Sequence, residues 1–360
     1  MLKITGYSDK YSICPGDDIK FYINSEYDEV YDTQIVRLIH GDTNPEGPGY
    51  KEEEISASCN KSYTGRNQRI HGGSYIVVPQ DDRLNLESFT IQCYIFPTTP
   101  DKGRQGIITK WIETTGSGYG LFINEAGCLA AEIGDGSGMV TRLSSDKALL
   151  RKVWYLAALS YDARTGRVTL YQEPVVTATN GGLGQAILNP SEDTTATVES
   201  NSSVRPAIND APLLMGASTL IERCGRSIFG AHFKEATSPV DLPEQTNLYN
   251  GKIDRPRLCS KALSKAEIES LARGFQTCAA ELRHHVVGAW DFHANITNNI
   301  ASTYIIDVST SRLNGHMINM PCRGMTGFNW TGDEIVYHHK PEEYGAIHFH
   351  DDDVHDAGWE

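Results

Sequence analysis

Short apolar runs separated by turn residues extend along most of the chain and constrain its fold more than any other feature. Clear examples lie at residues 89–96, 106–111 and 154–161, and turn signals recur between them, such as Asn-Gly-Gly at 180–182 and Arg-Thr-Gly-Arg at 164–167. Runs of this length bounded by Gly, Asn and Asp are the signal of β-strands. Many short strands at this spacing are typical of a β-sandwich or jelly roll. The sequence therefore predicts a mainly β protein.

The first 72 residues predict a small β-domain of their own. Ile19, Phe21 and Ile23 alternate with polar residues after a Pro-Gly turn, and a second run at 33–40 is closed by Gly-Asp. Period-two alternation of this kind indicates half-buried strands. We expect an immunoglobulin-like β-sandwich over residues 1–72, which would be marginally stable alone at this size and would lean on its neighbour.

A single short helix is expected late in the chain. Ser264 precedes the helical stretch 265–273, Glu267 stands three residues after it, and Gly274 follows. Ser and Glu at this spacing form a capping box, in which each side chain accepts a hydrogen bond from a backbone N–H of the first turn, and glycine suits the position after a helix.

Composition excludes several classes of protein. Hydrophobic residues make up 39% and charged residues 22% of the 360, an ordinary globular balance. The net charge of −14 argues against nucleic acid as a partner, and no apolar run approaches the ~18 residues of a membrane helix. Eight dispersed cysteines contain no C-x-x-C pair, and the first residues lack a secretory pattern. We expect a cytoplasmic protein with reduced thiols.

The negative charge is concentrated at one end. Residues 331–360 hold nine acids and one lysine, which gives −8, and five of the twelve histidines. On an extended strand His348, His350 and Asp352 would share one face, and two imidazoles with a carboxylate are ligands that iron or zinc accepts. These three residues are the candidate metal ligands. The alternative, which we prefer, is a solvated acidic edge or a polar interface, because the spacing matches no specific metal motif.

Catalytic motifs are absent from the sequence. There is no G-x-S-x-G and no H-E-x-x-H, and the glycine-rich stretches 116–120 and 135–138 lack the frame of a phosphate loop, so hairpin turns are the better interpretation. Cys93 and Cys128 lie among apolar strand residues and are expected to be inert core thiols. We predict no catalytic and no cofactor-binding residue in this chain.

The order of motifs in residues 73–283 resembles a laminin-G-like, concanavalin-type jelly roll. The likeness begins with Phe-Thr-Ile at 89–91 and includes Trp111 and Trp154, and its most specific stretch is Gly-Lys-Ile-Asp-Arg-Pro-Arg at 251–257, followed by Ala-Leu-Ser at 262–264. The resemblance implies that this stretch is the last strand and leads into the helix that covers one sheet. In it, Asp254 and Arg257 could pair across a turn, and a role in fixing the strand–helix junction is preferred. Residues 172–210 depart from the pattern as a Thr/Ser/Asn-rich insertion, expected to form a loop or an oligomer arm.

The remaining motifs resemble a narrower family. His-His-Val-Val-Gly-Ala-Trp-Asp-Phe at 284–292, the stretch 319–330 and the stretch 344–360, placed behind a small β-domain and a jelly roll, resemble the N-terminal half of the large subunit of N,N-dimethylformamidase. The resemblance implies that the large subunit continues into a catalytic portion that carries a mononuclear iron, and that a small helical subunit completes an oligomeric assembly. Residues 284–360 would then be a connecting segment toward a catalytic portion outside this chain, which would be a fragment or a separate polypeptide.

Two functions follow from these resemblances. In the first, the chain is the scaffold and oligomerisation portion of an iron-dependent amide hydrolase that converts N-substituted formamides to formate and an amine, and it is inactive alone. In the second, the chain is a stand-alone laminin-G-like module that binds glycan or protein without catalysis. Trp154 lies in an apolar run and is expected in the core, whereas Trp111 ends its strand and could reach a binding rim.

Overall fold

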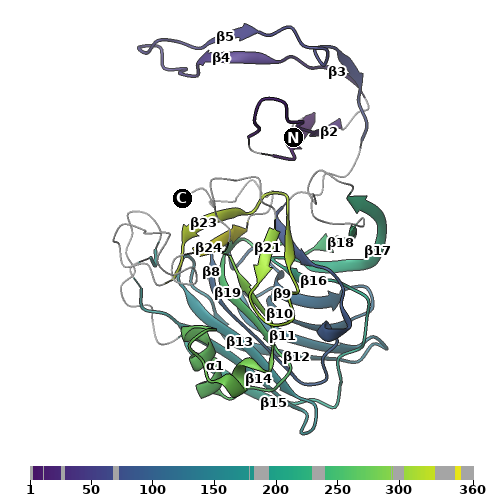
Figure 1. The fold of residues 1–360 in the computed structure, drawn as a ribbon, viewed down its shortest axis with the longest axis vertical. Helices are drawn as coiled ribbons and strands as arrows, with labels where there is room; N and C mark the ends of the chain where they lie inside the picture. Colours follow the sequence, from purple (N-terminus) through teal and green to yellow (C-terminus); the bar gives the residue numbers. More distant parts are fainter. Residues whose placement is uncertain are drawn as a thin grey trace. The chain divides into compact units, whose positions relative to one another are not determined.

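The chain folds into two compact units, residues Met1–His71 and Gly72–Glu360, in the computed structural model. The structure describes residues 3–10, 12–25, 29–67, 73–177, 179–181, 194–228, 240–292, 294, 304–328 and 345–349 (Figure 1). Among these residues, no helix has the length and apolar character that crossing a membrane requires.

The N-terminal unit consists of three two-stranded antiparallel sheets rather than a sandwich of two packed sheets. β1 pairs with β2, β3 with β6, and β4 with β5. The strands are β1 (Ile4–Ser8), β2 (Phe21–Ser25), β3 (Val30–Asp32), β4 (Val36–His40), β5 (Lys51–Glu54) and β6 (Ser62–Thr64). No hydrophobic side chain in the described part of this unit is buried. The expected immunoglobulin-like core is therefore not formed by these residues: strands of three to five residues give each ribbon too little apolar area to bury.

The second unit is a mainly β sandwich of two sheets, as the sequence predicts. The first, here the β9 sheet, has the strand order β12–β11–β10–β9–β16–β7–β22–β21, and β17 and β18 continue from the end of β9. Its strands are β7 (Tyr75–Val78), β9 (Gln105–Ile112), β10 (Ser117–Ile123), β11 (Cys128–Asp135), β12 (Val140–Ala148), β16 (Leu213–Met215), β17 (Ser218–Ile228), β18 (Val240–Thr246), β21 (Tyr304–Asp307) and β22 (Gly315–Ile318).

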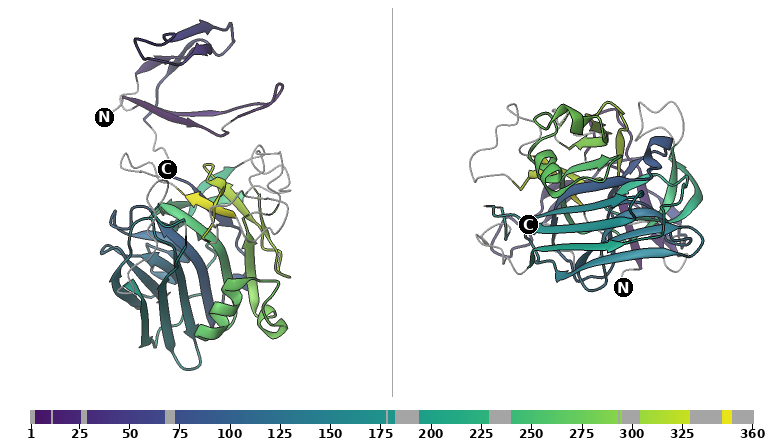
Figure 2. Two further views of the ribbon diagram at one scale, coloured as in Figure 1. Left: turned by 90° about the vertical axis from the view of Figure 1, so that its left-hand side faces the viewer. Right: turned by 90° about the horizontal axis from the view of Figure 1, so that it is seen from below.

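The second sheet, here the β8 sheet, has the order β15–β14–β13–β8–β19, and the far edge of β19 pairs with both β20 and β24. β23 pairs with β24, and β20 also pairs with β21, which joins the two sheets along one edge. Its strands are β8 (Phe89–Pro97), β13 (Tyr155–Asp162), β14 (Arg167–Pro174), β15 (Ala196–Asn201), β19 (Gly251–Cys259), β20 (Val286–Asp291), β23 (Cys322–Thr326) and β24 (Gly345–Phe349). Figure 2 shows the strands of the unit from two further directions.

The main core fills the space between the sheets. Alternate residues of each strand point into it: Ile91, Cys93 and Ile95 from β8 meet Leu121 and Ile123 from β10, all fully buried. Burying a side chain of this size contributes about 1.5–3 kcal/mol, so the two facing rows stabilise the packing of one sheet on the other.

A second apolar layer lies on the outer face of the β8 sheet, beneath α1 (Lys265–Arg273) and α2 (Ala280–Arg283). Ile268, Leu271 and Ala272 of α1 belong to one buried apolar cluster with Trp154 and Leu156 of the sheet region. The capping box is confirmed, since the Ser264 hydroxyl accepts from the Glu267 N–H and the Glu267 carboxylate accepts from the Ser264 N–H. Trp154 belongs to this layer, in agreement with the expected core position.

Two stretches that the sequence sets apart contribute strands to the sandwich. In the 172–210 insertion, β15 pairs with β14, and residues 182–193 lie outside the described part. In the segment expected to be a connection, β20 and β22 join the sheets, because Arg257 is aligned with Ala289 and Val77 with His316. Both strands are fully buried, so at Val286–Asp291 and Gly315–Ile318 this segment is part of the jelly-roll unit.

Candidate functional site

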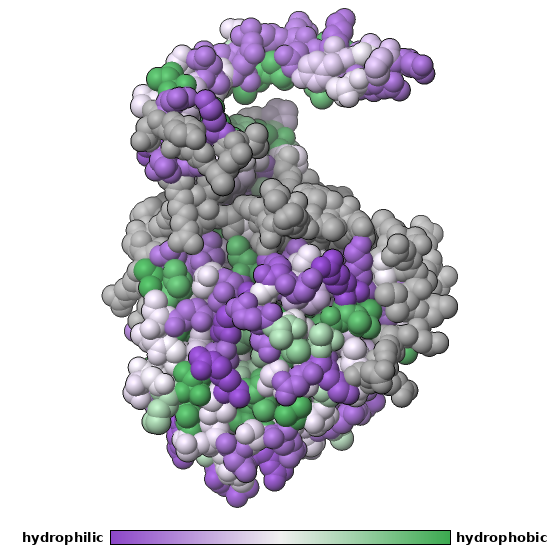
Figure 3. All heavy atoms as spheres, turned by 180° about the vertical axis from the view of Figure 1, so that it is seen from behind, coloured by the Kyte–Doolittle hydropathy of each residue, from purple (hydrophilic) through white to green (hydrophobic). Residues whose placement is uncertain are grey.

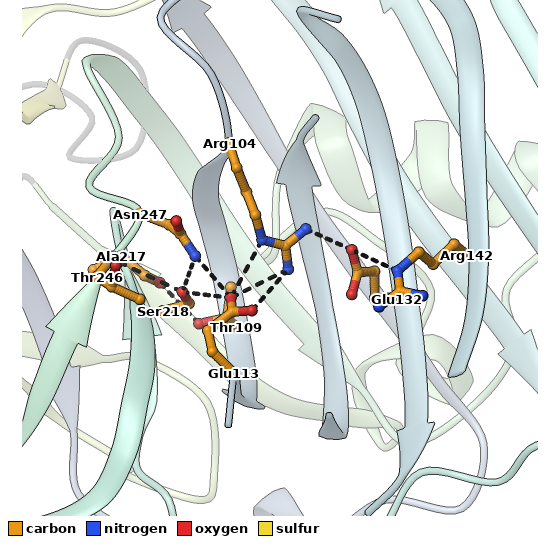
Figure 4. A network of polar contacts seen from close by, with 9 residues as sticks. All are labelled: Arg104, Thr109, Glu113, Glu132, Arg142, Ala217, Ser218, Thr246 and Asn247. Carbon is orange, nitrogen blue, oxygen red and sulfur yellow. Dashed lines mark hydrogen bonds and ion pairs between the residues drawn. The ribbon is translucent and has the colours of Figure 1, made fainter. Parts of the chain in front are cut away.

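A network of charged and polar side chains lies on the face of the β9 sheet that points away from the core. Arg104 stands at its centre, one residue before β9: its Nη1 donates to Glu132 Oε1 at 2.5 Å, and its Nη2 lies 3.2 Å from Glu113 Oε1. Arg142 Nε approaches the other side of Glu132 at 3.5 Å. Figure 4 shows these side chains converging from β9, β11 and β12.

The same network extends to the strands that follow β16. Glu113 Oε1 accepts hydrogen bonds from Ser218 Oγ and from Asn247 Nδ2, each at 2.8 Å, and Asn247 also donates to Ser218 Oγ at 2.9 Å (Figure 4). One carboxylate thus connects the end of β9 to the start of β17 and the end of β18. We call Arg104, Glu113, Glu132, Arg142, Ser218 and Asn247 the Arg104 network.

Two aromatic rings form the base of the network. The Arg104 guanidinium lies 4.0 Å from the centroid of Phe122, and Trp111 meets the same ring edge-on at 6.2 Å. Trp111 is 1% exposed, so it does not reach a binding rim as the sequence suggested. Gly134 explains the difference, because a Cβ there would stand 2.9 Å from the Trp111 ring, and its absence lets the indole lie flat on the sheet.

The Arg104 network is suited to holding strands together and to presenting charge, and not to acid–base chemistry. The Glu132 side chain is 6% exposed and Glu113 is 20% exposed, and both carboxylates face a guanidinium. A general acid or base needs a carboxyl oxygen that can exchange a proton with substrate, whereas Oε1 of Glu132 and Oε1 of Glu113 each already face more than one fixed donor. Only Arg142, at 67% exposure, offers solvent a free side of its charge.

Asp254 is the most perturbed acid in the described part of the chain. Its side chain is buried in the β8 sheet beside Cys93 and Tyr94, and burial raises the pKa of its carboxyl to about 7 against the pull of two arginines. Oδ2 has no hydrogen-bond partner among the described residues. Arg255, at a positive φ of 49°, donates to the carbonyls of residues 272 and 273 at the end of α1. Arg255, rather than the expected Asp254–Arg257 pair, thus makes the strand–helix contact.

Arg257 is buried elsewhere in the same sheet. It is 1% exposed and donates to the carbonyls of Pro256 and Trp290 at 3.1 and 3.2 Å. The guanidinium therefore fixes β20 against β19.

Phe328 anchors the last part of the chain onto the outer face of the β8 sheet. Its ring stacks on Tyr94 with centroids 3.6 Å apart, meets Trp154 edge-on at 6.3 Å, and lies 4.9 Å from the Arg255 guanidinium. The carbonyl of Phe328 accepts a hydrogen bond from Thr177. Aromatic pairs of this kind add about 0.5–1.5 kcal/mol each beyond the area they bury, so these contacts hold Phe328 on the sheet.

The candidate metal ligands of the sequence stay a prediction. His348 lies on β24, where the backbone pairs it with Lys252 and Cys322, and His350 and Asp352 lie outside the described residues. Within the described residues no group of three His, Cys, Asp or Glu side chains could hold a metal ion.

Two further expectations are confirmed. Cys93 and Cys128 are buried, and burial raises the pKa of both thiols, as expected for inert core cysteines. Residues 135–138 form the β11–β12 hairpin turn, in which Asp135 Oδ1 accepts from the N–H groups of Ser137 and Met139.

Sequence reasoning missed a buried lysine. Lys110 is 1% exposed, and its ammonium donates to Gln80 Oε1 at 2.8 Å, Asn209 O at 3.0 Å, Asn209 Oδ1 at 3.1 Å and Ala211 O at 2.7 Å. The available signal was a lysine within the apolar run Ile-Ile-Thr-Lys-Trp at 107–111, where a charge requires compensating oxygens.

Comparison with known proteins first defines the class of domain. Residues 71–216 match a laminin G family model described as Concanavalin A-like lectin/glucanases superfamily. Together with the two-sheet sandwich and its short helix, this match confirms the predicted laminin-G-like, concanavalin-type fold.

The similarity to two curated proteins is more specific. The chain is 37% identical over 367 residues to the N,N-dimethylformamidase beta subunit of Paracoccus aminophilus, and 36% identical over 366 residues to that of an Alcaligenes species. Each alignment covers 100% of this chain and 45% of the relative, so the chain spans about half the length of the curated proteins it matches. Both relatives are beta subunits, whereas the motifs resembled what we called a large subunit. That this chain corresponds to the N-terminal half of such a subunit stays a prediction.

Similarity to solved structures is low. A Limulus polyphemus SAP-like pentraxin is 12% identical with a TM-score of 0.32, covering 57% of this chain and 78% of its own. The CBM40 of a Ruminococcus gnavus IT-sialidase is 15% identical with a TM-score of 0.36, covering 57% and 95% respectively. We draw no argument about ligands from these likenesses.

Proposed function

We propose that this chain is a component of an N,N-dimethylformamidase-type amide hydrolase, in which it provides scaffold and subunit contacts rather than reacting groups. The observation that carries the proposal is the extent of the likeness. The laminin G family model matches only residues 71–216, whereas identity of 37% extends over the whole chain, through the N-terminal unit and the C-terminal segment. A shared jelly roll alone would not account for similarity in those two regions.

The proposed reaction is hydrolysis of an N-substituted formamide to formate and an amine. Iron would act in the complete enzyme as a Lewis acid toward the formyl oxygen or the attacking water. The residues present do not fit that metal, since the described part contains no group of His, Cys, Asp or Glu suited to it, and we derive no step through iron. The ligands would lie in residues beyond those described, including the remaining portion of the polypeptide.

The contribution of the described residues would be positional. The Arg104 network fixes β9 to β17 and β18, and Phe328 fixes the end of the stretch 304–328 to the outer face of the β8 sheet. A reacting site on a neighbouring portion needs its support held to a fraction of an ångström, which packed side chains and paired charges provide.

The expected partners follow from the same proposal. They are the remaining catalytic portion of the subunit and a small helical subunit, within an oligomer and in the cytoplasm. The relatives are named beta subunits, and a beta subunit is a component of a larger enzyme, which supports the expectation of further partners.

The test is to assay dimethylformamide hydrolysis and iron content for this chain alone and for the chain combined with the remaining portions. The expected result is neither iron nor hydrolysis in the isolated chain, and both in the assembly. Stoichiometric iron and turnover in the isolated chain would contradict the proposed division of labour. A glycan-array signal at millimolar concentration or below, lost on adding chelator, would favour the stand-alone binding module.

A further inference from the structure

The N-terminal unit exposes its apolar side chains instead of burying them. Of the fourteen large hydrophobic residues that are exposed in the described structure, ten belong to residues 1–71. Figure 3 shows apolar side chains at the surface of this unit. Five of them lie on or next to the β4–β5 ribbon, and we call them together the β4–β5 patch: Ile35, Leu38, Ile39, Tyr50 and Ile55, exposed by 38–58%. Leu38 and Ile39 are consecutive on β4, so the ribbon exposes apolar side chains on both of its faces.

The ribbon that carries this patch lacks the contacts that would hold it folded alone. Its two strands pair with each other from Val36↔Glu54 to His40↔Lys51, with an irregularity after Leu38. At the open end the Asn60 side chain bonds to the backbone of Ile35 and Ile55, and no third strand pairs with either β4 or β5 among the described residues. An isolated two-stranded hairpin is marginally stable in water and requires a third strand or an apolar partner. A patch of this composition on a marginal ribbon therefore marks a surface that another polypeptide covers.

We propose that the β4–β5 patch is the docking surface for the polypeptide that the longer relatives possess and this chain does not match. This inference rests on the proposed function. The relatives align with all of this chain, the ribbon included, over only 45% of their own length, which leaves 100 − 45 = 55% of each beta subunit as polypeptide that must pack against something.

The charges around the β4–β5 patch indicate what kind of partner surface would bind it. Glu52 and Glu54 stand opposite Leu38 and Val36 across the ribbon, and Glu53 stands opposite Arg37. Residues 1–71 hold eight Lys or Arg and twelve Asp or Glu, which gives −4. An apolar centre with acidic neighbours is complementary to an apolar surface bordered by Lys or Arg, and such a border sets orientation and association rate.

The first measurement is hydrogen–deuterium exchange of the isolated 360-residue chain. We expect the amides of β4 and β5 to exchange nearly as fast as an unstructured chain, at least about 100-fold faster than those of β8 and β9. Protection of the ribbon equal to that of β8 would overturn the inference, because the patch would then be covered by the chain itself. A concentration-dependent dimer that protects β4 and β5 would overturn it equally, in favour of a second copy.

The second measurement uses association with the missing portion. The chain is co-expressed with the unmatched portion of the Paracoccus aminophilus beta subunit as a separate polypeptide, and the affinity of the resulting complex is compared between variants. Leu38→Ser should weaken association by about 10- to 30-fold, since burying a leucine favours binding by a factor of this size. The matched control is Ile208→Ser, which changes a residue of the jelly-roll unit that is 82% exposed and should leave the affinity unchanged.

The outcomes separate this inference from the proposed function. A complex that forms equally well with wild type and both variants supports the proposed function and overturns the docking surface. Failure of the wild-type chain to form a complex refutes the proposed function and, with it, the docking surface. Since the five tryptophans all lie beyond residue 110, their fluorescence checks that the jelly-roll unit of each variant is folded.

Discussion

Replacing Lys110 with methionine tests whether the buried ammonium organises one end of the jelly roll. Its Nζ donates to four oxygens between 2.7 and 3.1 Å away, and these belong to Gln80, Asn209 and Ala211. Methionine preserves most of the side-chain volume but removes every donor, so the acceptors that are buried lose their partner. The four oxygens are neutral, so the variant leaves no uncompensated charge, and one buried acceptor left unsatisfied costs about 1–3 kcal/mol. We therefore expect Lys110→Met to reduce the free energy of unfolding by about 1–3 kcal/mol.

Urea unfolding followed by tryptophan fluorescence measures this loss of stability in the jelly-roll unit. All five tryptophans lie outside residues 1–71, so the signal does not report the N-terminal unit. Lys261→Met is the control, because the Lys261–Glu267 pair is 44% and 33% exposed and exposed pairs contribute at most about 1 kcal/mol. A loss of under about 1 kcal/mol for Lys110→Met would refute the reasoning, since it would mean that water or the surrounding loops replace the ammonium without cost.

Three further changes test other parts of the structure. Burial raises the pKa of Asp254 from 3.8 to about 7, so the contribution of its protonated carboxyl to stability is complete below about pH 4 and is lost as pH rises through 7. Wild type should therefore lose about 3 kcal/mol of unfolding free energy between pH 5 and pH 8 that Asp254→Asn does not lose. Equal dependence of the two proteins on pH in urea unfolding would contradict this. Glu113→Gln removes the ion pair between Arg104 and Glu113, whose side chains are 18% and 20% exposed, and should cost about 1–2 kcal/mol of unfolding free energy. Asp101→Asn, in a pair whose side chains are 60% and 63% exposed, should cost less than about 0.5 kcal/mol, and equal losses would show that burial does not govern the network. Ser264→Ala removes the hydroxyl that accepts from the Glu267 N–H in the capping box and should lower the unfolding free energy by about 1 kcal/mol. An unchanged unfolding free energy would show that packing alone holds the first turn of α1.

Local patterns were sufficient to predict much of the fold. The strand runs at 89–96 and 106–111 become β8 and β9, and the Ser264–Glu267 spacing becomes an observed capping box. Each of these features depends on residues within a few positions of one another, where steric and hydrogen-bonding rules act directly on the sequence.

The features that escaped prediction depend on residues far apart in the chain. Trp111 is buried because Gly134 leaves room for its ring, and Lys110 is buried because Asn209 supplies two oxygens about 100 residues later. No local pattern encodes such a pairing. The Arg104 network was missed for the same reason, since it draws together residues from 104 to 247.

The N-terminal unit shows the limit of periodicity. Its alternation correctly predicts strands, yet alternation specifies only that one face of a strand is apolar and not what that face meets. We expected the apolar face of each strand to pack against a second sheet of the same domain, whereas the structure leaves residues such as Phe21, Val30 and Leu38 exposed.

The order of strands in the β9 sheet has a consequence for synthesis of the protein. β7, with the sequence Tyr-Ile-Val-Val, is the first strand of the jelly roll to leave the ribosome, but its two neighbours are β16, which begins about 140 residues later, and β22, about 240 residues later. At about 5–20 residues per second, translation takes roughly 12–48 s to supply the second neighbour. Both edges of this apolar strand stay unpaired until β16 emerges, after roughly 7–28 s, and one edge stays unpaired until β22 follows. Unpaired apolar edges are the condition under which nascent chains aggregate or recruit chaperones. The yield of this protein in a cell should therefore respond to translation speed and chaperone supply more than the stability of its finished sandwich would suggest.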